Sequence, residues 1–108
     1  MDLSLAGWDI EPFDAVEWVP WGSQPGFARA KVLANADGYM VALVEANPGY
    51  QGDPHVHEYP EFLHVIDGTV ENQGRTMNKG DSYAAATGST HSEFGSATGA
   101  TYVLVFKI

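Results

Sequence analysis

The sequence predicts an all-β fold, a small jelly-roll barrel (double-stranded β-helix), from three observations. Twelve glycines and six prolines interrupt only 108 residues. No apolar pattern repeats at helical spacing, and short β-branched and aromatic segments alternate with turn residues instead. The length accommodates about eight to ten short strands, which suits a jelly roll. Because 108 residues is the usual size of one domain, we expect a single domain over residues 1–108.

The N-terminal part, residues 1–38, is the least regular. Its apolar residues have no fixed spacing and are broken by Pro12, Pro20 and Gly22. It contains all three tryptophans, Trp8, Trp18 and Trp21. Large aromatic side chains need apolar contacts, so we expect extended segments that pack on a barrel formed by residues 39–108. Packing explains the tryptophans most simply, and stacking of one of them on a substrate is the alternative.

Strands follow from alternation and from the turn residues between apolar runs. The expected strands are residues 26–33, 39–45, 55–57, 62–66, 69–72, 75–77, 82–85, 91–94 and 102–107. A loop is expected over residues 46–52. Asp37-Gly38 indicates a hairpin, and Gln73-Gly74 joins the two strands on either side of it. In the last strand, alternation places Tyr102, Leu104 and Phe106 on one face and the valines between them on the other.

Composition excludes several classes of function. The formal charge is −9, with fourteen acidic and five scattered basic residues, whereas nucleic-acid binding needs a positive surface. The absence of cysteine excludes disulfides and thiolate metal sites. No apolar run reaches membrane-spanning length, and the N-terminus has no basic cluster typical of a signal peptide. We therefore expect a soluble cytoplasmic protein that binds neither nucleic acid nor membrane.

All four histidines lie between residues 49 and 91, and three of them have the spacing of metal ligands. His55 and His57 are two residues apart, so on a strand they point to the same face. Glu61 follows shortly after, and His91 can return to the same point through tertiary folding. Imidazole is the commonest metal ligand, and a mixed nitrogen and oxygen set suits divalent Fe, Mn, Co, Ni or Zn. His55, His57, Glu61 and His91 are thus the candidate metal ligands.

Other polar residues near these ligands have more than one interpretation. Alternation in the strand expected at 62–66 sends His64 to the face opposite Glu61, so packing or solvent exposure is the expected role of His64. Glu58 could hold a ligand imidazole in one tautomer or lie in solvent. Glu93 has the same parity as His91, which makes it a candidate proton-transfer group. Tyr83 is a second candidate catalytic residue. Tyr83 and Phe94 are also candidates to line the pocket, and core packing explains both equally well.

The spacing of these residues resembles the two signature motifs of the cupin superfamily. The first motif is matched at every fixed position by Gly49, His55, His57, Glu61 and Gly68. The second is matched by Gly80, Gly88 and His91. Ala86 stands where the family usually has proline and Gly95 where it usually has asparagine, and neither departure removes a metal ligand. The resemblance covers roughly residues 39–108, and within the superfamily residues 80–108 look most like the ChrR-like branch.

The resemblance implies one divalent ion per chain, Fe(II), Zn, Mn or Ni, with coordination positions open to a small-molecule ligand or substrate. The ChrR-like similarity favours a metal-dependent enzyme of the dioxygenase type, which oxidises a dicarbonyl or a phenolic ketone. Cupins also include redox-neutral isomerases and lyases, and ChrR-like cupins occur as the sensory half of anti-sigma factors. A redox-neutral enzyme, a non-catalytic sensor or binding module, and a purely structural metal site therefore stay open as alternatives.

Two features predict a homodimer. Phe62 and Ile66 should point away from the barrel interior, and the N-terminal tryptophans add further apolar surface. Exposed apolar patches usually mark an interface, and the resemblance to cupins also implies a dimer.

Overall fold

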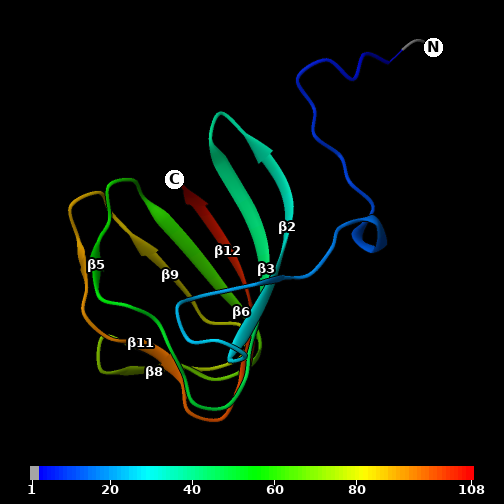
Figure 1. Cartoon of the computed structure of the whole chain (residues 1–108). Helices are drawn as coiled ribbons and strands as arrows, with labels where there is room; N and C mark the ends of the chain where they lie inside the picture. Colours follow the sequence, from blue (N-terminus) through cyan, green and yellow to red (C-terminus); the bar gives the residue numbers. More distant parts are fainter. Residues whose placement is uncertain (1–2) are drawn as a thin grey trace.

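The computed structural model describes residues 3–108 and confirms the all-β fold (Figure 1). The first two residues of the predicted N-terminal segment lie outside the described residues. A short 3₁₀ helix, η1 (Phe13–Ala15), precedes the strands. Within the part of the chain described, no helix is long and apolar enough to span a membrane.

One side of the barrel is a six-stranded antiparallel sheet. Its strands, in spatial order, are β1 (Val19–Pro20), β2 (Ala28–Ala36), β3 (Tyr39–Ala46), β12 (Ala100–Lys107), β6 (Glu61–Gly68) and β9 (Ser82–Ala85). The central strand β12 lies between β3 and β6, which are far apart in the sequence. This order is reached only by long-range pairing, as in a jelly roll.

The other side of the barrel consists of shorter strands. A four-stranded sheet has the order β4 (Tyr50–Gln51), β11 (Phe94–Ser96), β7 (Val70–Asn72) and β8 (Arg75–Met77). A separate two-stranded ribbon pairs β10 (Thr90–His91) with β5 (His55–Val56). Figure 1 shows β5, β8 and β11 on the opposite side of the fold from β2, β3 and β12.

The core lies between these two sides and is built by strand alternation. In β12, Tyr102 and Leu104 are 1% and 7% exposed, while Val103 between them is only half-buried. In β6, Leu63 and Val65 are buried. Each such side chain contributes roughly 1.5–3 kcal/mol by leaving water. The predicted division of the last strand into an inner and an outer face is therefore confirmed.

The hairpin predicted at Asp37-Gly38 is present, with a tighter turn than expected. Ala36 lies opposite Tyr39, so the loop contains only two residues. Their φ angles, 53° at Asp37 and 83° at Gly38, are both positive. This is the turn that matches the twist of the flanking strands. Because the turn is short, β2 extends beyond the predicted end at residue 33 and reaches Ala36.

The strand predicted over residues 91–94 is wrong, because it is two strands. β10 ends at His91 and β11 begins at Phe94. The backbone N–H groups of Ser92 and Glu93 both donate to Oε1 of Gln73, each at 2.7 Å. This side chain occupies donors that a continuous strand would use in its ladder. The predicted loop at 46–52 likewise contains a short strand, β4.

The N-terminal segment contacts the barrel over only part of its length. The Lys31 ammonium donates to the carbonyl oxygen of Phe13 at 3.0 Å and lies 3.8 Å from the centroid of the Phe13 ring. The Arg29 guanidinium lies 4.0 Å from the centroid of the Trp18 ring. In contrast, Trp8 is 72% exposed, and the chain before η1 runs away from the barrel in Figure 1. Packing on the barrel was expected throughout this segment. It is seen from η1 onward, and before η1 the backbone N–H of Asn35 in β2 donates to Oδ2 of Asp9 at 2.8 Å.

Candidate metal centre

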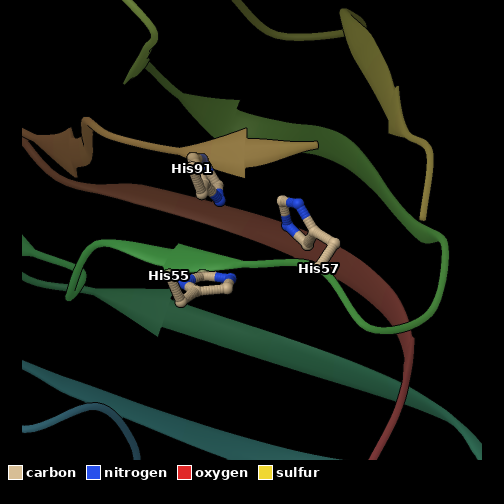
Figure 2. Close-up of side chains that lie close together, drawn as sticks. All are labelled: His55, His57 and His91. Atoms are coloured by element: carbon tan, nitrogen blue, oxygen red, sulfur yellow. The ribbon is translucent and has the colours of Figure 1, made fainter. Parts of the chain in front are cut away.

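Three imidazoles meet at one end of the barrel. His55 in β5 and His91 in β10 are paired directly across the two-stranded ribbon, and His57 follows β5 by one residue. Their metal-binding ring nitrogens all lie within 4.8 Å of one another. Figure 2 shows the three rings turned toward a common point from two neighbouring segments. The predicted gathering of these histidines is therefore confirmed, and they could hold a metal ion.

The three rings differ in their access to solvent. His57 and His91 are each 6% exposed, whereas His55 is exposed. The ring centroids are 4.8 Å apart for His55 and His57, and 5.2 Å from each of these to His91. The cluster is thus closed on two sides and open at His55.

Each ring is oriented by a hydrogen bond from its outward-facing nitrogen. Nδ1 of His55 donates to the backbone carbonyl oxygen of Asp53 at 2.8 Å, and Nδ1 of His57 donates to that of Ser89 at 3.1 Å. Nε2 of His91 donates to Oδ1 of Asn72 at 2.6 Å. These acceptors fix the proton on the outward nitrogen, as is usual for imidazoles that bind metals. The inward nitrogens therefore carry lone pairs.

The inward lone pairs fit a metal ion. Among the buried side-chain nitrogen and oxygen atoms of residues 3–108, Nδ1 of His91 is the one without a hydrogen-bond partner. Leaving a buried polar atom unpaired is costly, and a metal ion at the common point would satisfy it. Burial lowers the pKa of His91, against an opposing effect of Glu61. His91 is thus held in the neutral form that binds metals.

Glu61, the first residue of β6, lies beside the three rings. Its Oε2 is 3.3 Å from Nε2 of His57 and 3.9 Å from Nδ1 of His91. Because the proton of neutral His57 lies on Nδ1, its Nε2 cannot donate to the carboxylate, and a cation between the two atoms would relieve their repulsion. The structure brings Glu61 to the histidines as the sequence suggested, and its role as fourth ligand stays a prediction.

Tyr83 contacts the same carboxylate. Its hydroxyl donates to Oε2 of Glu61 at 2.6 Å. Burial raises the pKa of Tyr83 far above its usual value, and the negative charge of Glu61 raises it further. Tyr83 therefore stays protonated and acts as a donor that holds Glu61 in place. It lies close to the histidine cluster, and its catalytic role stays a prediction.

A cavity of about 200 Å³ opens onto the metal centre. Its walls are the aromatic rings of Trp21, Tyr50, Tyr83, Phe94 and Tyr102. Its polar groups come from Asp53, His55, Glu61 and His91. None of the described residues around it is a lysine or an arginine. The site therefore combines a cluster of metal-binding nitrogens with an apolar space large enough for a small molecule.

Sequence reasoning named Tyr83 and Phe94 as candidates for this wall but missed the rest of it. Trp21 comes from the N-terminal segment, for which a substrate-stacking role was only an alternative. Tyr50 lies in a region predicted to be a loop, and Tyr102 was predicted only as the inner face of a strand. Nothing in their spacing relates them to the histidine motif, because tertiary packing alone brings them together.

Two predicted polar residues do not reach the cavity. Glu93 is exposed and does not line it, because the strand break before Phe94 interrupts the parity on which its prediction rested. Phe94 faces the cavity instead. Glu58 is also exposed. His64 lies on the outer face as predicted, with Nδ1 2.6 Å from Oγ of Ser82.

Comparison with known proteins identifies the family and the fold. The model of the family described as the ChrR cupin-like domain matches residues 10–107. No curated protein matches the sequence. The fold is similar to that of a candidate acetylacetone dioxygenase from Methylibium petroleiphilum PM1, with a TM-score of 0.80, 18% identity and coverage of 99% of this chain and 81% of that one.

Two further solved structures are similar. An acetylacetone dioxygenase from Acinetobacter johnsonii aligns with a TM-score of 0.76, 15% identity and coverage of 99% of this chain and 78% of that one. The anti-sigma factor ChrR from Rhodobacter sphaeroides, solved in complex with SigE, aligns with a TM-score of 0.72 at 16% identity. The alignment covers 89% of this chain and 52% of that one. At these identities the likeness shows the fold alone.

Proposed function

The chain belongs to the ChrR cupin-like family, and on that premise we propose that it is a metal-dependent enzyme acting on a small organic molecule. The observation that carries the proposal is the convergence of three imidazole lone pairs, one of them otherwise unpaired, beside an open cavity. A purely structural metal site would be enclosed by its ligands, whereas a catalytic one leaves a position open.

In this proposal His55, His57, Glu61 and His91 hold one divalent ion per chain, Fe(II), Zn, Mn or Ni. When bound, such an ion supplies Lewis-acid activation of a substrate oxygen and, if it is Fe(II), activation of dioxygen. The residues of the chain prepare the site for this chemistry. Tyr83 fixes the Glu61 carboxylate through the 2.6 Å hydrogen bond, and the aromatic walls exclude water from the substrate.

The favoured reaction is a dioxygenase-type oxidation of a dicarbonyl or a phenolic ketone. Two structures with this fold are named for dioxygenase activity on acetylacetone, one of them as a candidate. The absence of basic side chains among the described residues of the cavity is compatible with such a substrate. A redox-neutral isomerase or lyase reaction at the same metal is the nearest alternative.

The second candidate is a non-catalytic sensor or binding module. A structure with this fold is the anti-sigma factor ChrR, bound to SigE. The open cavity beside the histidine cluster suits a substrate and a sensed ligand alike, so turnover of the bound molecule is what separates the enzyme from the sensor.

The experiment begins with elemental analysis of protein purified without a histidine tag. One divalent ion per chain is expected, and His57→Ala should lose it, whereas His64→Ala on the outer face should retain it. Protein loaded anaerobically with Fe(II) should then change its visible spectrum on addition of acetylacetone. Oxygen uptake should require both the metal and the dicarbonyl. Full iron loading without uptake over a panel of dicarbonyls and phenolic ketones would refute the dioxygenase proposal.

We also propose that the protein forms a homodimer and acts in the cytoplasm. Phe62 and Ile66 on the outer face of β6 are 46% and 40% exposed, and Leu3, Leu5 and Ile10 are more exposed still. Apolar surface of this extent favours an interface between copies. The cytoplasmic location rests on the sequence composition alone.

A further inference from the structure

We infer that the cavity selects small ligands that carry no negative charge, and that Asp53 at its rim is the residue that rejects anions. The inference rests on the proposed function, since it describes which molecules reach the metal centre. It follows from the charges, the wall chemistry and the size of the cavity.

Apart from the metal ion, the charged side chains around the cavity have one sign. Asp53 and Glu61 line it, and no basic residue in the described part of the chain does. Two cations of the barrel are engaged elsewhere: the Arg29 guanidinium pairs with Glu45 at 2.7 Å, and the Lys107 ammonium lies 4.8 Å from the centroid of the Tyr59 ring. A ligand with a carboxylate or phosphate outside the metal sphere would therefore meet negative charge without a compensating donor cation.

Asp53 is placed to impose this selection. It is exposed at the entrance, two residues before His55, and its backbone carbonyl is held by the His55 ring at 2.8 Å. Its carboxylate is close enough to Tyr50 to contribute to the raised pKa of that phenol, after the larger effect of burial. The Glu61 carboxylate accepts the hydrogen bond of Tyr83 and faces the histidine cluster. The exposed carboxylate of Asp53 is therefore the charge that an entering ligand meets first.

The walls present ring surfaces and few free polar groups. The hydroxyl of Tyr83 donates to Glu61 at 2.6 Å, and the rings of Tyr50 and Tyr102 are buried. Phe94 packs edge-on against Tyr83 and Tyr102, with ring centroids 6.5 Å and 5.6 Å away. Because aromatic rings form most of the wall, the body of the ligand meets apolar surface. The polar atoms of the ligand then find their partners at the metal ion and the groups around it.

The size of the cavity narrows the class further. Its volume of about 200 Å³ is smaller than the roughly 300–1,000 Å³ of pockets that hold drug-sized ligands. The ligand class is therefore a compact, uncharged molecule with an apolar body and one or two oxygen atoms that can approach a metal.

A matched pair of probes tests the inference by binding alone. Acetylacetone and 3,5-dioxohexanoate share the 1,3-diketone group, but 3,5-dioxohexanoate adds a carboxylate on one terminal methyl. Binding of each to the zinc-loaded, redox-inert protein would be measured by calorimetry. Acetylacetone should bind at least about tenfold more tightly, and Asp53→Asn should reduce this ratio about fivefold. Asp67→Asn, which removes an exposed charge outside the cavity, should leave the ratio unchanged.

A second readout does not depend on a variant. Raising the salt concentration should shrink the preference for acetylacetone, because screening weakens the repulsion by an exposed charge. Equal binding of the two probes, or binding of neither, would overturn the inference. Preferential binding of acetylacetone, without oxygen uptake by the Fe(II) protein, would support the inference while refuting the dioxygenase proposal.

Discussion

The hydroxyl of Tyr83 in β9 donates a 2.6 Å hydrogen bond to Oε2 of Glu61 in β6, and that same oxygen faces His57 at 3.3 Å. The two strands are neighbours in the six-stranded sheet. Glu61 therefore has one position rather than a range of rotamers. The carboxylate is pre-organised toward the histidine cluster by a residue that is not itself a candidate ligand.

Removing this hydrogen bond should weaken the metal site. In Tyr83→Phe the ring packing stays and only the donor is lost, so we expect metal affinity to fall about tenfold to a hundredfold, as is typical when a partner of a ligand is removed. Titration against a competing chelator would measure it. Tyr59→Phe, which alters a partly exposed phenol outside the aromatic cavity, is the matched control. Unchanged affinity in Tyr83→Phe would argue against Glu61 as a ligand.

The lowered pKa of His91 predicts how the metal-free protein responds to acid. Burial, the largest cause, holds the pKa in the folded state below the ordinary value of 6.5. As the pH falls, His91 is therefore protonated in the unfolded chain before it is protonated in the folded protein. The contribution of neutral His91 to the free energy of unfolding is present above about pH 6.5 and is lost below it. Thermal unfolding of the metal-free protein between pH 7.5 and 5.5 should show this loss, and His91→Gln should show less of it.

Comparing Gly68 with Gly74 tests why the first cupin motif has glycine at position 68. Gly68 and Gly74 have nearly the same φ, 76° and 75°. A Cβ on Gly68 would overlap the carbonyl oxygen of Gly99, whereas nothing lies within 4 Å of one on Gly74. Both alanine variants should lose about 1 kcal/mol or more from backbone strain, and Gly68→Ala should lose more because the backbone of Gly99 must move. Denaturant unfolding would give the free energy of unfolding of both variants. A larger decrease for Gly68→Ala measures the overlap with Gly99, and equal decreases would show that the overlap is relieved at no cost.

The sequence predicted those features that depend on local periodicity or on a known motif. Alternation correctly placed Tyr102 and Leu104 inside and His64 outside, and the motif spacing correctly gathered three histidines. The break between His91 and Phe94 could not be predicted, because it depends on the side chain of Gln73 from a distant turn. Trp21 and Tyr50 reach the cavity through tertiary packing, which leaves no periodic signal in the sequence.

The last prediction concerns assembly. The outer face of the six-stranded sheet carries Phe62 and Ile66, and a hollow beside Phe62 is lined by further apolar residues such as Val103 and Val105. If this face is the interface of a homodimer, Phe62→Lys should place an unpaired charge in it and dissociate the dimer, while the metal content stays at one ion per chain. Light scattering at tens of micromolar would give the mass of both proteins. The dimer interface would lie elsewhere if the variant stays dimeric, and a monomeric unmodified protein would refute the dimer itself. The N-terminal segment, with Trp8 exposed, would then be the next surface to test by Trp8→Ala.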